Sequence, residues 1–183
     1  MSTLKNSTNS RKAIGILLSE ASAPIRWRVE LEILEREPKT VSKDELLAYP
    51  RVRENLDYLT GETDFNSIHG STERAFENAC GILYDMGVRS GAKELDERIK
   101  PYLDFLEALD DDTDDRYLHT SFLGREFSAS LIAGSVSALG YNGHPAVRKH
   151  VEARLERLSE FGPGSTPRPF MRLTRPATRR CGG

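Results

Sequence analysis

Residues 125–158, REFSASLIAGSVSALGYNGHPAVRKHVEARLERL, carry the most regular pattern in the chain. The first half reads as a partly apolar helix that is rich in small side chains, and the second half has the spacing of an amphipathic helix. Between them, GYNGH (140–144) forms a turn, and Pro145 suits the first position of the helix that follows. The stretch therefore predicts a helical hairpin.

The second helix of this hairpin has two earlier counterparts. PRVRENLDYL, ERIKPYLDFL and PAVRKHVEARL begin at residues 50, 97 and 145, so the steps between them are 47 and 48 residues. A period of this length indicates stacked helical hairpins, each of which buries its apolar face on its neighbours. In this register the aliphatic positions coincide in two sets: Val52, Ile99 and Val147, and Leu56, Leu103 and Val151.

The other apolar patterns also have helical spacing. Helices are expected near residues 14–20, 24–36, 43–48, 50–59, 71–87 and 94–109, with a polar loop at 61–67. Ser42 and Glu45 match a capping box, and Gly87 suits a helix C-terminus. No segment alternates like a strand, so we predict an all-α fold of seven or eight helices. We also predict that residues 1–160 form a single hairpin-repeat domain and that residues 161–183 form a disordered Gly/Pro/Arg-rich tail.

Composition and charge favour a cytoplasmic protein. The chain has 183 residues and two cysteines, which form no disulfide framework, and it contains no apolar run long enough to span a membrane and no signal peptide. Its net charge of -2 hides a basic tail, because residues 161–183 contain arginines and no acid. The body is therefore acidic, which does not favour specific binding of nucleic acid.

The segment LGYNGHPAVRKHVEARLERL (139–158) resembles the helical-hairpin repeat of the terpenoid cyclase and protein prenyltransferase superfamily, the α/α toroid. IRWRVELEILEREP (25–38) is similar to the opening of prokaryotic proteins with prenyltransferase and squalene-cyclase repeats. The resemblance covers roughly residues 24–158, and it implies a helical domain that binds an apolar, isoprenoid-type ligand in its concave centre.

The chain also departs from that superfamily. It has room for fewer hairpins than a full toroid, and it lacks both the Gln-Trp repeats of the triterpene cyclases and the zinc ligands of the prenyltransferases. A short relative, a truncated relative, or a protomer that completes its barrel as a homo-oligomer would each account for these differences.

An acidic run, DDDTDD at residues 110–115, matches two aspartate motifs of that superfamily. Residues 112–115 fit D-x-D-D, in which a protonated carboxyl group delivers a proton to an alkene, so the resemblance implies catalytic roles for Asp112, Asp114 and Asp115. Residues 110–114 also fit D-D-x-x-D, which binds Mg²⁺ and a diphosphate. The alternative is a solvated loop or an acidic helix N-terminus.

Two histidines are candidate ligand-binding residues. His69, in SIHGST, comes just before a predicted helix, and His119 follows the acidic run closely enough to pair with it. Capping or a local hydrogen bond is the alternative for each. No two histidines have the spacing of metal ligands on a helix, and Cys80 lies on an apolar stripe, which predicts a buried apolar residue rather than a nucleophile.

Two functions stay open. One is a terpenoid-cyclase-like or prenyltransferase-like domain that binds an isoprenoid-type ligand, and the other is a non-catalytic helical-repeat scaffold that binds a protein partner on its concave face. The small side chains of residues 124–138 fit both, because they either let helices approach closely or leave room for a ligand.

Overall fold

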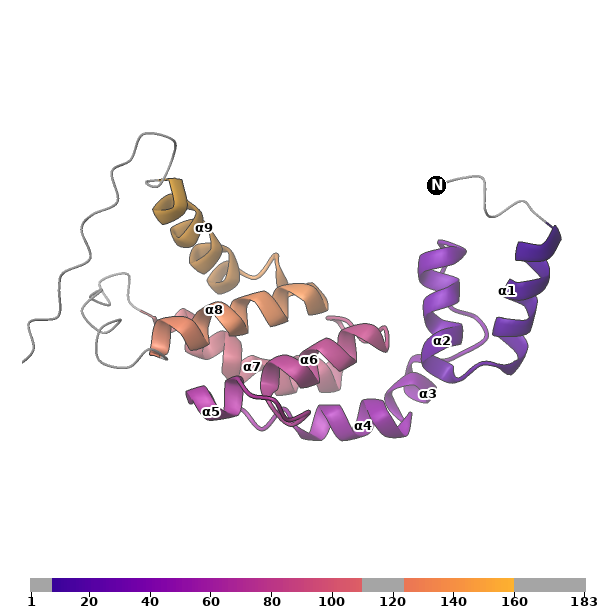
Figure 1. Cartoon of the computed structure of the whole chain (residues 1–183), viewed down its shortest axis with the longest axis horizontal. Coiled ribbons are helices and arrows are strands. Elements are labelled where there is room, and N and C mark those ends of the chain that lie inside the picture. The colour runs from indigo at the N-terminus through magenta and orange to yellow at the C-terminus, as the bar shows by residue number, and fades with distance from the viewer. Residues whose placement is uncertain (1–7, 110–123, 160–183) are drawn as a thin grey trace, which may run out of the picture.

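The computed structural model describes residues 8–109 and 124–159 (Figure 1). Over these ranges the regular structure is helical throughout, without a strand, which confirms the all-α prediction. The α-helices are α1 (Thr8–Glu20), α2 (Ala23–Arg28), α3 (Lys43–Leu47), α4 (Pro50–Asp57), α5 (Phe65–Ile68), α6 (Phe76–Asp85), α7 (Lys93–Glu107), α8 (Arg125–Val136) and α9 (Pro145–Ser159), and two π-helical turns are η2 (Val29–Ile33) and η4 (Ser137–Tyr141). The predicted domain end at residue 160 and the predicted tail, residues 161–183, lie outside the described ranges.

The helices stack as hairpins. The helices of the two hairpins follow one another along the chain, α6 and α7 and then α8 and α9. α6 packs between α4 and α8, and α7 packs against α8 and α9. Along the longest axis of the molecule, α1 and α2 lie at one end and α9 at the other (Figure 1). The described helices therefore form an open array, and the resemblance to an α/α toroid is not confirmed. Among these helices, none is both long and apolar enough to cross a membrane.

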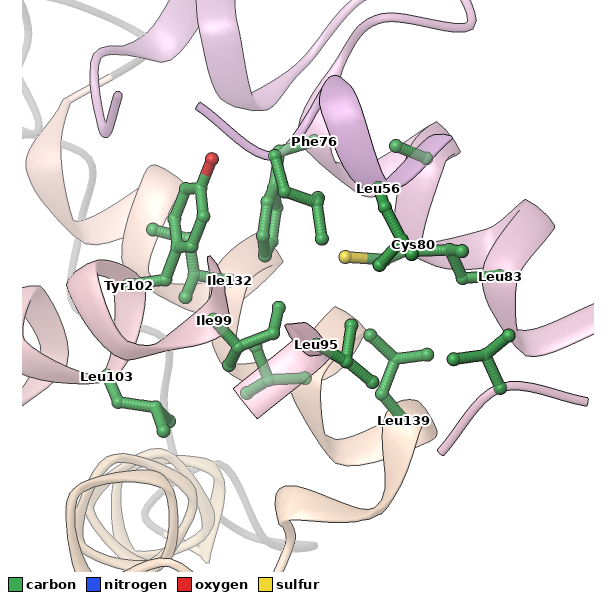
Figure 2. Close-up of a cluster of buried hydrophobic side chains, with 14 of the residues drawn as sticks. Leu56, Phe76, Cys80, Leu83, Leu95, Ile99, Tyr102, Leu103, Ile132 and Leu139 are labelled. Carbon is green, nitrogen blue, oxygen red and sulfur yellow. The ribbon is translucent and has the colours of Figure 1, made fainter. Parts of the chain in front are cut away.

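The core lies where α4, α6, α7 and α8 meet (Figure 2). Phe76 and Tyr102 pack with ring centroids 4.0 Å apart, and both rings are buried. The hydroxyl group of Tyr102 accepts a hydrogen bond of 3.0 Å from the backbone N–H of Gly61, so its polar atom is satisfied within the core. Other members shown in the figure are Leu56, Cys80, Leu83, Leu95, Ile99, Leu103, Ile132 and Leu139.

The predicted repeat register agrees with the burial of the side chains. Val52, Ile99 and Val147 are all buried, as are Leu56 and Leu103. The same register aligns three ion pairs of i,i+4 spacing, one on the second helix of each repeat. They are Arg53–Asp57 on α4, Lys100–Asp104 on α7 and Arg148–Glu152 on α9. The exception is Val151, which is exposed although its counterparts are buried.

The two loops before α6 differ from the predictions. Residues 61–67 were expected to form a polar loop, but Asp64 caps the short helix α5 by accepting bonds from the backbone N–H groups of Asn66 and Ser67. α6 begins at Phe76 rather than at residue 71. In contrast, the N-cap half of the predicted capping box is confirmed, because the Ser42 side chain accepts a 3.0 Å hydrogen bond from the backbone N–H of Glu45. The Glu45 side chain instead accepts a hydrogen bond from Arg26.

The N-terminal helices are organised around a buried carboxylate that the sequence pattern did not reveal. The predicted amphipathic helix over residues 24–36 is divided into α2 and η2, and the π-helical turn changes which side chains face inward. Leu31 and Leu34 are only half-buried, whereas Val29 and Glu30 are fully buried or nearly so.

Hydrogen bonds to the Glu30 side chain hold the loop after η2 against η2. Its Oε2 accepts hydrogen bonds from the backbone N–H groups of Lys39 and Thr40, both at 2.9 Å, and from Thr40 Oγ1 at 2.8 Å. Its Oε1 lies 2.8 Å from Arg36 Nη2. Burial raises the pKa of Glu30, but these hydrogen bonds outweigh it and hold the pKa at about 2, below the ordinary value of 4.5.

Glycine allows these N-terminal helices to pack on the end of α6. Gly87 has φ +85°, and a Cβ atom added there would lie 2.9 Å from both Trp27 Cδ1 and Arg28 Cγ. Arg28 Nη1 also donates a 2.9 Å hydrogen bond to the carbonyl oxygen of Asp85. The predicted C-terminal role of Gly87 is confirmed, and the close approach adds a second reason for glycine at this position.

We expect Glu30→Gln to destabilise the N-terminal helices by about 2 to 3 kcal/mol at neutral pH, because the amide cannot accept all the bonds that the carboxylate accepts. The pKa of Glu30 is lower in the folded than in the unfolded state, so its contribution is present above about pH 4.5 and is lost as the pH falls towards 2. Urea unfolding followed by the fluorescence of Trp27, the single tryptophan, measures this effect.

Glu37→Gln is the matched control, since Glu37 is exposed. It should leave both stability and its pH dependence unchanged. If the two variants unfold alike at every pH, the role assigned to Glu30 is wrong.

Candidate functional site

Most of the predicted site residues fall outside the described ranges. Asp112, Asp114, Asp115 and His119 all lie within residues 110–123, so their catalytic and ligand-binding roles, and the role of Mg²⁺ at the acidic run, stay predictions. His69 is described. It lies beside the surface that α6 and α8 form together.

His69 contacts side chains of three helices, α5, α6 and α8. Its Nδ1 lies 2.5 Å from Glu77 Oε1, which also accepts a 3.3 Å hydrogen bond from the backbone N–H of Gly70. The Asn78 side chain donates to the carbonyl oxygen of Gly70 at 2.7 Å, so the loop before α6 is held against the first turn of that helix. The local hydrogen bond that was the alternative role for His69 is therefore observed.

An aromatic cluster surrounds the same histidine. The rings of Phe65, His69 and Phe127 lie with centroids 5.3 to 5.9 Å apart in every pair. Phe65 belongs to α5 and Phe127 to α8, so the beginnings of α6 and α8 lie close together. At their far ends, Ser90 N donates to the carbonyl oxygen of Leu139 at 2.8 Å. The two helices therefore run side by side in the same direction (Figure 1).

A groove of about 410 Å³ lies between these two helices. The exposed ring of Tyr84, on the last turn of α6, lines one end of the groove, whereas the exposed ring of Phe127 on α8 packs beside His69 and is not part of the lining. The guanidinium group of Arg89 packs 3.9 Å from the centre of the Tyr84 ring. The groove is lined by Glu77, Cys80, Gly81, Tyr84 and Asp85 of α6 and by Ser130, Leu131, Gly134, Ser135 and Ala138 of α8 and η4.

Small side chains create this groove. A Cβ atom added at Gly81 or Gly134 would meet no other atom within 4 Å, so both positions open to empty space. The opposite face of α8, with Ser128, Ala129 and Ala133, is buried against the core. Close packing, one of the two explanations offered for the small residues of this helix, therefore applies to the inner face. The outer face is open, and room for a ligand there stays a prediction.

Cys80 forms part of the floor, and its burial raises the pKa of its thiol well above the ordinary value. The prediction that it is a buried apolar residue is confirmed.

A hydrogen bond between side chains joins the two hairpins. The Tyr141 hydroxyl group donates a short hydrogen bond to Asp96 Oδ1, which also accepts a 3.0 Å bond from the backbone N–H of Gly91. Burial and the Asp96 carboxylate raise the pKa of Tyr141, which keeps this phenol protonated. This bond therefore links η4, which continues α8, to α7.

A second hollow, of about 770 Å³, lies between the end of α7, the start of α8 and α9. Leu106 and Leu109 line its base, and its walls carry both signs of charge, with Arg148 and Lys149 near Glu126 and Glu152. Leu109 is the last residue before the undescribed segment 110–123. Because the segment that follows Leu109 is not described, no function is assigned to this hollow.

Within residues 8–109 and 124–159, no group of three or more histidine, cysteine or acidic side chains is placed to hold a metal ion. In comparisons with family models, curated proteins and solved structures, the chain matches none of them. The resemblance to the terpenoid cyclase and prenyltransferase superfamily thus stays a prediction. The α6–α8 groove is the surface for which a function is proposed.

We expect Cys80 to be almost unreactive in the folded protein, because a buried thiol with a raised pKa supplies little thiolate. In a Cys181→Ser variant, a maleimide reagent should label less than a tenth of the chains natively and all of them in urea, as measured by mass spectrometry (about tenfold contrast).

The control is Gly81→Cys in a chain that also carries Cys80→Ala and Cys181→Ser, since position 81 opens into the groove. This cysteine should react within minutes. Equally fast native labelling of Cys80 would contradict its assigned burial.

Proposed function

We propose that the protein is a non-catalytic helical-repeat scaffold, and that the groove between α6 and α8 binds a short amphipathic helix of a protein partner. The observation that carries the proposal is the combination of a floor of small side chains with the exposed aromatic ring of Tyr84 at one end. Exposed aromatic and apolar side chains around a groove are typical of surfaces that bind a partner helix.

The dimensions of the groove suit a helix of a few turns. Its α6 side extends from Glu77 to Asp85, which is about 12 Å at 1.5 Å per residue. Gly81 and Gly134 lie on opposite walls near the middle, where the absence of side chains lets a partner backbone approach closely. Tyr84 can then pack on an apolar side chain at one end of the bound helix.

The charge of the lining favours a basic partner. The ionisable carboxylates that line the groove are Glu77 and Asp85, which lie about two helical turns apart, and no lysine or arginine of the described chain is among the lining residues. A bound helix with lysines or arginines at a similar spacing can place one near each carboxylate. Charge complementarity of this kind adds specificity more than affinity.

An isoprenoid-binding enzyme receives less support from the described residues. Carbocation chemistry requires a dry, enclosed cavity, whereas the α6–α8 groove is open to solvent and has exposed glycines in its walls. His69 and Glu77 form a pair at the groove's end, but they are engaged in holding the loop before α6. The scaffold is therefore the better-supported function.

The first test uses two synthetic helical peptides of about three turns. Both carry leucines at i, i+4 and i+7, and they differ only in whether two flanking residues, two turns apart, are lysine or glutamate. We expect the lysine peptide to bind with a micromolar Kd by fluorescence polarisation and the glutamate peptide to bind about tenfold more weakly.

We expect Gly134→Leu to weaken binding of the lysine peptide by at least about tenfold, because a Cβ atom at this position meets no other atom within 4 Å and the leucine side chain then occupies space in the groove. Gly15→Leu is the matched control. It makes the same substitution at an uncrowded helical glycine on α1, and it should leave the Kd unchanged.

Two results would contradict the proposal. One is equal binding of the peptide to wild type and Gly134→Leu. The other is turnover of a polyprenyl diphosphate, with or without Mg²⁺, that is lost in Asp114→Asn, which would favour the terpenoid-cyclase prediction.

A further inference from the structure

The charge of the basic C-terminal segment is opposite to that of the α6–α8 groove. The charged side chains among the groove's described lining residues are the carboxylates of Glu77 and Asp85. Residues 161–183 contain no acid and five arginines, which are Arg168, Arg172, Arg175, Arg179 and Arg180. Removing these five charges from the net charge of -2 leaves -7 on residues 1–160. Charge complementarity therefore favours a contact between the segment and an acidic surface of the chain.

Within the segment, residues 168–172, RPFMR, have a spacing that matches the groove. An extended chain advances about 3.3 Å per residue, so Arg168 and Arg172 then lie about 13 Å apart. The α6 side of the groove extends over about 12 Å between its two carboxylates. A residue before a proline favours an extended backbone, and Arg168 precedes Pro169, so the extended spacing is the appropriate one.

The order of side chains in this stretch also matches the groove. Side chains of an extended segment alternate between its two faces, so Arg168, Phe170 and Arg172 share one face. On the α6 side of the groove, Gly81 lies midway between the two carboxylates. A Cβ atom added at Gly81 or at Gly134 on the opposite wall would meet no other atom within 4 Å. The Phe170 ring can therefore fill this open space while an arginine lies on each side of it.

The segment begins close enough to the groove to reach it. Ser130 lines the groove, and its Oγ lies 3.4 Å from Nε2 of His150 on α9. From His150 to Ser159, the end of α9, the helix rises by about 14 Å. The nine residues that lead from Ser159 to Arg168 can span about 30 Å when extended. The chain is therefore long enough for Arg168 to return to the groove of the same molecule.

We propose that residues 168–172 occupy the α6–α8 groove of their own chain when no partner is bound, with Phe170 over the two glycines and an arginine beside each carboxylate. This occupant rests on the proposed function, because it requires the groove to be a docking surface for basic segments. A partner helix must displace the segment, so the segment lowers the apparent affinity of the groove by intramolecular competition.

The first test traps the docked segment with a disulfide bond in the full-length protein. A chain that carries Cys80→Ala and Cys181→Ser receives Gly81→Cys in the groove and Phe170→Cys in the segment. Under mild oxidation we expect the two introduced thiols to join within one chain, because docking raises their effective concentration. Mass spectrometry after proteolysis identifies the bond and gives its rate of formation.

Two controls separate docking from the random encounters of a tethered segment. In the same background, Gly15→Cys with Phe170→Cys places the first thiol on another uncrowded helical glycine, and this pair should join at least about tenfold more slowly. Adding Arg168→Glu/Arg172→Glu to the groove pair should slow trapping to a similar degree, because the charge contacts are then repulsive. Circular dichroism checks that each variant keeps its helix content.

The second test measures the competition itself with the lysine peptide. In the full-length protein, Arg168→Glu/Arg172→Glu should bind this peptide about fivefold more tightly than wild type, because the groove is then unoccupied. Arg179→Glu/Arg180→Glu makes the same change in net charge outside residues 168–172, and it should bind like wild type.

The proposal is overturned if the thiols at positions 81 and 15 are trapped at the same rate, or if the disulfide bond joins two chains. It is also overturned if trapping is insensitive to the arginine substitutions but is lost when the five aspartates of residues 110–115 are replaced by asparagine, which would assign the segment to that acidic run. A peptide that binds no variant contradicts the proposed function instead, and the trapping rates still decide whether residues 168–172 lie in the groove.

Discussion

The fold depends on one constraint: a single helical hairpin cannot bury its own apolar face, so each must stack on the next. α6 and α7 satisfy it from both sides, because α6 packs on α4 and α8 while α7 packs on α8 and α9. The stacked rings of Phe76 and Tyr102 lie within this shared core. The same constraint explains why Val151 differs from its counterparts, since no further hairpin of the described chain follows α9.

α8 illustrates how one sequence feature supplies both stability and a surface. The alanines on its inner face allow close packing against the core, whereas Gly134 on its outer face leaves space beside Gly81. The two ends of the α6–α8 pair are joined by the hydrogen bond from Ser90 N to the carbonyl oxygen of Leu139 and by the contact between the rings of His69 and Phe127. The groove is therefore present before a partner binds, and a preformed surface reduces the entropic cost of binding.

The chemistry of the groove between α6 and α8 follows from the side chains that line it. They are mainly small, and the ionisable ones among them are acidic, which suits a basic partner helix.

The sequence by itself determined the helical class, the repeat register and several helix ends, because these depend on local spacing and on capping residues such as Ser42 and Gly87. It identified His69 as a residue of interest, but the contact with Glu77 and the ring of Phe127 depends on how α5 and α8 are brought together. Only the tertiary structure decided that Glu30 is buried, since a π-helical turn and donors from residues 36–40 together outweigh the cost of desolvating its charge. The groove was equally a tertiary outcome, because a small side chain becomes either a packing contact or an open surface according to which face of its helix meets a neighbour.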